Sequence, residues 1–135
     1  MLGIDTNVLV RLLVRDDPAQ FACAFDMIKQ ELAQGHPVLI NHSVLLETVW
    51  VLQSRYKLDK ARLVAMLSGL LAVDDVRLED EASVESALFL WKNANAGFAD
   101  CLISSKNQRL GCRATATFDV KAARVVGFVP VVALD

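Results

Sequence analysis

The chain contains few of the residues that hold small proteins together covalently or through zinc. Among its 135 residues are three cysteines, with no C-x-x-C pair, and two histidines. We therefore expect neither a disulfide framework nor a structural zinc site. His36 follows a glycine and His42 opens a predicted helix, so we interpret both as ordinary structural residues rather than metal ligands.

Long hydrophobic runs are also missing. No uninterrupted apolar stretch approaches the roughly 18 residues that a membrane-spanning helix needs, and no basic segment followed by an apolar one resembles a secretory signal. We therefore expect a cytoplasmic protein without membrane contact. The sequence has no internal repeats, low-complexity segments or linker, which predicts a single domain over residues 1–135.

Positive charge is not in excess, since the formal net charge is −2. The broad basic surface typical of nucleic-acid-binding proteins is therefore absent. The charges are nevertheless unevenly distributed, because residues 92–124 contain six bases and only two acids, Asp100 and Asp119. This local excess makes five bases candidates for binding the phosphate groups of a nucleic acid, with an ordinary solvated surface as the alternative: Lys106, Arg109, Arg113, Lys121 and Arg124.

The hydrophobic content is high, at 54% of residues, compared with about 45–50% in typical proteins. Such an excess is expected when a parallel sheet is buried on both faces. Short apolar runs predict strands over residues 1–4, 38–40, 76–78, 113–118 and 129–132. Helical patterns follow Asp5 and occupy about 18–34, 44–56, 60–73, 81–94 and 98–110, with Ser43 and Asp59 as predicted caps. This alternation predicts an α/β fold of three layers, α/β/α, with a mostly parallel central sheet of four to five strands.

Two acids interrupt the apolar segments of the first half. Asp5 ends the first predicted strand, and the carboxyl ends of strands are where ligands bind in open α/β sheets; the alternative is that Asp5 caps the following helix. Glu47 lies within a helix that is apolar nearly all round and is therefore predicted to be buried. A buried carboxylate needs a metal or an ion pair, for which Arg11 and Arg15 are candidates.

Two further acids occur in the second half. Asp100 falls in the first turn of a predicted helix, where the helix dipole alone could explain it. Asp119 directly follows a predicted strand and could simply cap the next helical turn. A single hypothesis accounts for all four acids: they meet at one edge of the sheet and hold Mg²⁺ or Mn²⁺, hard cations that prefer oxygen ligands. One or two such ions serve the hydrolysis of phosphodiester bonds.

The segments around these acids resemble those of PIN-domain nucleases. They are Asp5-Thr6-Asn7, Leu46-Glu47-Thr48, Phe98-Ala99-Asp100 and Thr117-Phe118-Asp119. More narrowly, the chain is similar to the VapC-type ribonuclease toxins of type II toxin-antitoxin pairs.

The resemblance implies an Mg²⁺- or Mn²⁺-dependent endoribonuclease with Asp5, Glu47, Asp100 and Asp119 as its catalytic and metal-binding acids. Asp5 and Asp100 are favoured as direct ligands, and Thr6, Asn7 and Thr117 as supporting residues. It further implies a homodimer, inhibited by a cognate antitoxin that covers the site and itself contacts operator DNA.

Other classes fit less well. A phosphatase of the haloacid dehalogenase type needs a second aspartate two residues after the first, where this chain has Asn7. No phosphate-binding G-x-x-x-x-G-K-[ST] loop is present. The remaining alternative is a catalytically weak PIN fold that serves as a binding or regulatory module, and the intact set of four acids favours the nuclease.

Overall fold

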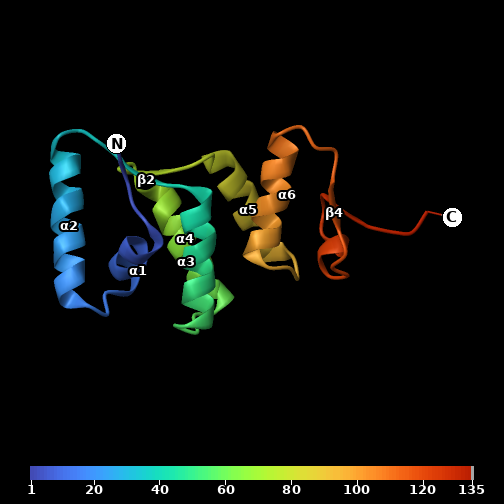
Figure 1. Ribbon diagram of the computed structural model, residues 1–135, viewed down its shortest axis with the longest axis horizontal. Helices are drawn as coiled ribbons and strands as arrows, with labels where there is room; N and C mark the ends of the chain where they lie inside the picture. Colours follow the sequence, from blue (N-terminus) through green and yellow to red (C-terminus); the bar gives the residue numbers. More distant parts are fainter. Residues whose placement is uncertain (135) are drawn as a thin grey trace. The chain divides into compact units, whose positions relative to one another are not determined.

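The computed structural model describes residues 1–134 and forms two compact units, of which the first is Met1–Glu79 and the second begins at Asp80. Along the described chain, two helices lie between each consecutive pair of the first four strands (Figure 1). Every pair of strands within it is parallel. The predicted α/β class is therefore confirmed.

The first unit is built on a three-stranded parallel sheet in the order β1-β2-β3. Its elements are β1 (Leu2–Gly3), α1 (Thr6–Val14), α2 (Pro18–Ala33), β2 (Val38–Ile40), α3 (His42–Ser54), α4 (Lys60–Ala72) and β3 (Val76–Leu78). The central strand β2 pairs Val38 with Leu2 on one side and with Val76 on the other. Val38 and Ile40 are buried, as expected for an inner strand of a sheet that helices cover.

Each helix of the first unit begins at a side chain that accepts a hydrogen bond from the backbone three residues later. The four caps are Asp5, Asp17, Asn41 and Asp59. The prediction of Asp59 as a cap is confirmed, whereas that of Ser43 is wrong, because α3 starts at His42 and Asn41 caps it. Asparagine satisfies a free N–H group as well as serine does, so either residue was chemically suitable.

The second unit combines a helical hairpin with a small parallel sheet. It contains α5 (Glu81–Asn93), α6 (Phe98–Arg109), β4 (Thr115–Thr117), a 3₁₀ turn (Ala122–Arg124) and β5 (Phe128–Pro130). The two helices lie side by side (Figure 1). Trp91 of α5 contacts Phe98 of α6 with ring centroids 5.2 Å apart, and both rings are buried.

The five predicted strands are present, but they pair differently from the single sheet expected. Within residues 1–134 they form a three-stranded sheet and the two-stranded sheet β4-β5. The last strand is also shorter than predicted and begins one residue earlier. Gly127, with φ of 96°, makes the turn immediately before Phe128. Pro130 is the last residue of the strand, and just beyond it the Val131 N–H still donates to the Thr117 carbonyl at 2.9 Å.

None of the helices within residues 1–134 is both long and apolar enough to cross a membrane. The expectation of a single domain over residues 1–135 stays a prediction.

Candidate active site

A polar pocket lies in the first unit at the start of α1 and α3. It has a volume of about 270 Å³ and is lined by Asp5, Thr6, Asn7, Ser43, Val44 and Glu47. Because β1 and β2 are parallel neighbours, the helices that follow them both begin at the carboxyl edge of this sheet. This edge is where the sequence predicted a ligand site, and we call this feature the acidic pocket.

Asp5 has a structural role and a free oxygen. Its Oδ1 atom accepts a hydrogen bond from the backbone N–H of Val8 at 3.1 Å, which confirms Asp5 as the N-cap of α1. Its Oδ2 atom accepts none from residues 1–134, and the side chain is exposed. Capping and ligand binding are therefore compatible, because each can use a different carboxylate oxygen.

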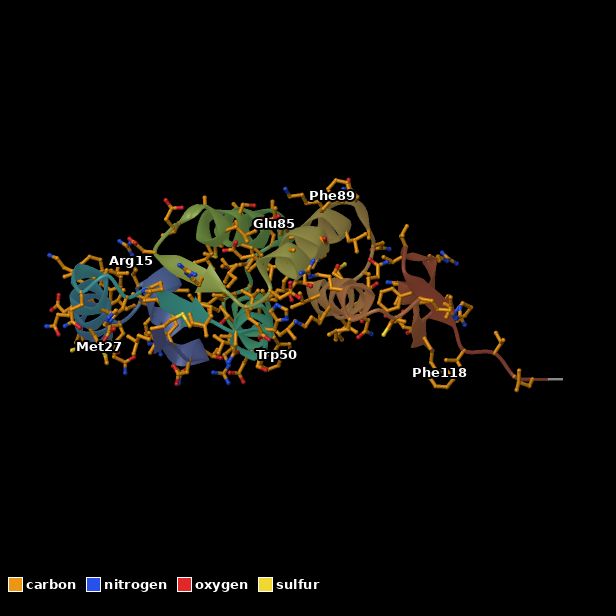
Figure 2. The ribbon with its side chains drawn as sticks, turned by 90° about the horizontal axis from the view of Figure 1, so that it is seen from above. Arg15, Met27, Trp50, Glu85, Phe89 and Phe118 are labelled. Atoms are coloured by element: carbon orange, nitrogen blue, oxygen red, sulfur yellow. The ribbon has the colours of Figure 1, made fainter. Side chains whose placement is uncertain are left out.

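Glu47 is exposed, so the prediction that it is buried is wrong. The core-facing side of α3 consists of Leu45, Thr48, Val49 and Leu52. Glu47 lies on the other side, one turn before Trp50, whose side chain is 60% exposed and points outward (Figure 2). The apolar composition of α3 therefore led to a prediction of more burial than the structure shows. Glu47 lines the acidic pocket as an accessible carboxylate.

The alternative considered for Glu47, an ion pair with Arg11 or Arg15, is not formed. Arg11 instead binds Asp16, with Nη1 and Oδ1 3.1 Å apart, and Arg15 lies over the ring of Phe21, 4.7 Å from its centroid. Within the described residues Glu47 has no ion pair, so its charge is not neutralised by a neighbouring base.

The polar network around Arg11 explains why this arginine does not reach Glu47. The Tyr56 hydroxyl donates to Asp16 Oδ2 at 2.7 Å, and Arg11 donates to the Tyr56 oxygen at 3.2 Å. The hydrogen bond from Tyr56, followed by the charge of Arg11, lowers the pKa of Asp16. Arg11 thus ties the end of α1 to the residues that follow α1 and α3.

Asp100 lies in the second unit, as the third residue of α6, and is half-buried. The N-cap of this helix is Gly97, which has no side chain to bind the free N–H groups. A Cβ atom placed on Gly97 would lie 4.0 Å from Asp100 Oδ2, so the carboxylate lies beside the helix start. The positive end of the helix dipole favours a carboxylate there, as the alternative interpretation held.

Asp119, also in the second unit, stabilises the turn after β4. Its Oδ1 atom accepts hydrogen bonds from the backbone N–H groups of Lys121 at 2.8 Å and Ala122 at 3.0 Å. The Thr117 hydroxyl in turn accepts a hydrogen bond from the Asp119 N–H at 3.0 Å. Thr117 therefore holds the backbone of Asp119. The helical turn considered after Asp119 is the 3₁₀ turn Ala122–Arg124.

Two of the five candidate RNA-binding bases are engaged by an acid within the second unit. Lys106 Nζ lies 3.0 Å from Asp80 Oδ2, and Arg109 Nε lies 2.7 Å from Asp80 Oδ1. A hydrogen bond from the Ser83 hydroxyl, supported by Lys106 and Arg109, holds the pKa of Asp80 well below its usual range. Arg113, Lys121 and Arg124 are exposed and form no ion pair in the described part of the chain.

The sequence interpretation missed Ser43 as a pocket residue and Asp80 as the partner of two bases. Ser43 was assigned only to capping, although its place two residues after Asn41 puts it near the same helix start. Asp80 precedes Glu81 and stands three residues before Ser83, which is a recognisable helix-start pattern. No local sequence pattern indicates that Lys106 and Arg109 of α6 bind Asp80.

Comparison with known proteins identifies the family. A family model described as the PIN domain matches residues 3–127. The chain belongs to the PIN-domain family. A VapC ribonuclease from Aquifex aeolicus (strain VF5) is 23% identical over 116 residues, which cover 85% of this chain and 84% of that protein. The predicted resemblance to PIN domains and VapC-like proteins is confirmed, and PIN domains are typically metal-dependent nucleases.

In this PIN domain the four predicted acids are divided between the two units. Asp5 and Glu47 line one pocket of the first unit, together with the predicted supporting residues Thr6 and Asn7. Asp100, Asp119 and Thr117 belong to the second. Among residues 1–134, no three Asp, Glu, His or Cys side chains form a group that could hold a metal ion. The convergence of all four acids on one metal stays a prediction.

The acidic pocket nevertheless has the donor chemistry that a hard cation requires. Its polar side chains are carboxylates, hydroxyls and an amide, with neither histidine nor cysteine among them. Oxygen donors of this kind suit Mg²⁺ and Mn²⁺ rather than zinc or copper.

Proposed function

We propose that this PIN domain is a metal-dependent endoribonuclease that hydrolyses RNA phosphodiester bonds. The observation that carries the proposal is the pair of accessible carboxylates, Asp5 and Glu47, in one oxygen-lined pocket at a carboxyl sheet edge. Membership of a family whose domains are typically metal-dependent nucleases supports it.

Asp5, Glu47, Asp100 and Asp119 would hold Mg²⁺ or Mn²⁺, with Asp5 and Asp100 as direct ligands. When bound, the ion activates water and neutralises charge on the phosphate. The Val8 N–H fixes the orientation of the Asp5 carboxylate and leaves its Oδ2 atom available. Glu47, which has no ion pair within residues 1–134, can accept a hydrogen bond from the attacking water.

The supporting residues act on the acids rather than on RNA. Thr6 and Asn7 follow Asp5 directly and line the same pocket, where they can orient ligands and bound water. Thr117 holds the backbone of Asp119 through its hydroxyl. Arg113, Lys121 and Arg124 are proposed to contact RNA phosphates, with Lys106 and Arg109 less available because both bind Asp80.

The Asp5→Asn variant tests the proposal most directly. Asparagine also caps helices well, so α1 should remain intact while the pocket loses a charge. Mutation of a residue that only orients a metal ligand typically reduces metal affinity or activity by about 10- to 100-fold. We therefore expect loss of the ligand itself to reduce Mg²⁺-dependent cleavage of a mixed RNA pool at least about 100-fold.

The matched control is Asp59→Asn, which changes the N-cap of α4 in the same way but lies outside the acidic pocket. It should cleave RNA like the parent protein. If Asp5→Asn also cleaves like the parent, the metal-site assignment is wrong.

We further propose that the protein is the toxin of a toxin-antitoxin pair, acting in the cytoplasm as a homodimer. The similarity to a VapC ribonuclease supports this. A cognate antitoxin would cover the site, and operator DNA would be bound only through that antitoxin. Induced expression should stop growth, the Asp5→Asn variant should not, and co-expression of the adjacent small gene should restore growth. Growth unaffected by the active protein would argue against the toxin assignment.

A second candidate is a catalytically weak PIN module that binds RNA or a protein partner. It is favoured by the finding that no group of three metal-binding side chains exists within residues 1–134. Under this alternative, RNA remains uncleaved with Mg²⁺ or Mn²⁺, whereas the nuclease cleaves it and is stopped by EDTA. We also propose that residues 1–135 act as one domain, which predicts a single unfolding transition for both units.

A further inference from the structure

The second unit contains a pocket whose charge is opposite to that of the acidic pocket. It has a volume of about 400 Å³, and the residues that matter here are Phe89, Asn93, Asn95, Lys121, Arg124 and Val126. Its lining includes two cations and no acid. The volume falls within the range of about 300–1,000 Å³ typical of small-molecule sites. We call it the basic pocket.

The two cations of the basic pocket are available to a ligand. Lys121 and Arg124 are exposed and form no ion pair with any residue from 1 to 134, in contrast to Lys106 and Arg109. Their backbone is anchored, because Ala122 and Val125 between and beside them are buried. Both positive side chains therefore extend from a fixed turn, and an anion is the ligand that such a pair attracts.

The lining residues from the end of α5 and the loop after it include an aromatic ring and two amides. The side-chain N–H of Asn93 donates to the backbone carbonyl of Phe89 at 3.0 Å. The side-chain oxygen of Asn93 accepts no hydrogen bond within the described residues. Asn95 adds a second amide. The Phe89 ring is 68% exposed and projects from the outer side of α5 (Figure 2). Exposed aromatic rings next to amides and cations are typical of sites that bind unstacked bases.

Residues 125–126 of the lining are followed directly by Gly127, whose backbone lies close to α6. Gly127 has φ of 96°, and a Cβ atom there would lie only 2.5 Å from the Ser104 hydroxyl of α6. Glycine is therefore needed both for the backbone conformation and for the close approach. The chain therefore passes close to α6 directly after Val126, a residue that lines the basic pocket.

We propose that the basic pocket binds a nucleotide of single-stranded RNA. Lys121 and Arg124 would contact the phosphate, Phe89 would stack on the base, and the two asparagines would bind the base edge. This deepens the proposed function and rests on it, since the pocket would be a substrate subsite of the ribonuclease. The segments that line it also lead to the two candidate site acids of the second unit. The loop after Asn93 precedes the helix that carries Asp100, and Asp119 accepts a hydrogen bond from the backbone N–H of Lys121.

Binding can be measured separately from cleavage with the intact protein in EDTA. The probe is a fluorescein-labelled single-stranded RNA of mixed sequence, followed by anisotropy at several salt concentrations. For Lys121→Ala/Arg124→Ala we expect at least tenfold weaker binding. The salt slope should fall by about 1.4, since each phosphate contact to a single strand contributes about 0.7.

A second variant tests the aromatic contribution. Phe89→Leu removes the ring but keeps an apolar side chain, and should weaken binding about fivefold or more, as expected for the loss of one stacked base. Its effect on the salt slope should be negligible, because no charge changes. Circular dichroism verifies that each variant is folded, and Lys121→Gln/Arg124→Gln replaces the alanine pair if that pair does not fold.

The matched control is Lys29→Ala/Arg62→Ala, which removes two exposed cations of the first unit that lie outside the acidic pocket. It should leave the salt slope within about 0.3 of the parent, well below the change of about 1.4 expected for the pocket. If the pocket variants bind RNA like this control, the basic pocket is not an RNA site, even if Mg²⁺-dependent cleavage shows that the protein is a nuclease.

The remaining outcomes also separate the two proposals. RNA binding that depends on the pocket, but without any cleavage, supports the pocket and refutes the nuclease. A labelled polyglutamate peptide that binds through Lys121 and Arg124 more tightly than the RNA would mean an acidic protein ligand, and would overturn the nucleotide assignment.

Discussion

Asp5 in the first unit and Asp80 in the second occupy equivalent positions and have different environments. Both are N-cap residues that accept a hydrogen bond from the backbone three residues later. Asp5 keeps one carboxylate oxygen free of hydrogen bonds within residues 1–134 and faces a pocket. Both oxygens of Asp80 are bound, by Ser83, Lys106 and Arg109. The same residue type thus stabilises a helix hairpin in one unit and remains available for chemistry in the other.

The largest expected effect concerns activity and tests whether acids from the two units serve one reaction. We expect Asp5→Asn and Asp100→Asn each to reduce RNA cleavage at least about 100-fold, as for loss of a metal ligand. The double variant should be barely worse than either, since residues that act as a unit are strongly non-additive. Single-turnover kinetics measure all three rates. Effects that multiply would indicate two independent roles.

The next largest effect concerns the stability of the second unit. Asp80→Asn should lower the free energy of unfolding by about 1–2 kcal/mol, because hydrogen bonds to a charged group are lost and two bases are left without their partner. Urea denaturation gives the value. Asp74→Asn changes an exposed acid of the first unit in the same way and should have little effect. Equal midpoints for the two variants would mean that the Asp80 pairs contribute nothing.

The same comparison predicts a dependence on pH. The folded-state pKa of Asp80 is lowered, mainly by the hydrogen bond from Ser83 and then by Lys106 and Arg109. The contribution of ionised Asp80 to the free energy of unfolding is therefore complete above the unfolded-state pKa of about 3.9. This contribution is lost as the pH falls through the lowered folded-state pKa. The stability difference between the parent and Asp80→Asn should be constant from about pH 6 to 8 and shrink below about pH 4. A difference that grows on acidification would contradict this assignment.

The smallest effect separates capping from pocket formation in the first unit. Asn41→Ala should destabilise the protein by about 1 kcal/mol, because the Val44 N–H loses its acceptor. Ser43→Ala should leave stability almost unchanged, since Ser43 lines the acidic pocket and is not the cap. Thermal unfolding distinguishes the two. The reverse order would restore Ser43 as the cap of α3.

Much of the secondary structure could be predicted because its signals are local. The strands Val38–Ile40 and Val76–Leu78 have the predicted limits, and α4 begins after Asp59 as expected. Apolar runs and capping side chains act within a few residues, so they can be recognised in any short window. The four acids were predicted in the same way, from the segments that surround each of them.

The exposure of Glu47 and the pairing of bases could not be predicted from such windows. Glu47 was assigned to the core from the composition of its helix, although only one side of α3 is buried. Lys106 and Arg109 were treated as free bases, although each binds Asp80, more than 20 residues earlier in the sequence.

The sequence by itself determined the α/β class, the PIN-domain character and the identity of the candidate acids, because these depend on residue types in short ordered segments. Only the tertiary structure decided that Asp5 has a free oxygen while Asp80 has none. It also decided that Lys121 and Arg124, rather than Lys106 and Arg109, border an open pocket. The physical reason is that the availability of a charged group depends on which distant side chains pack beside it.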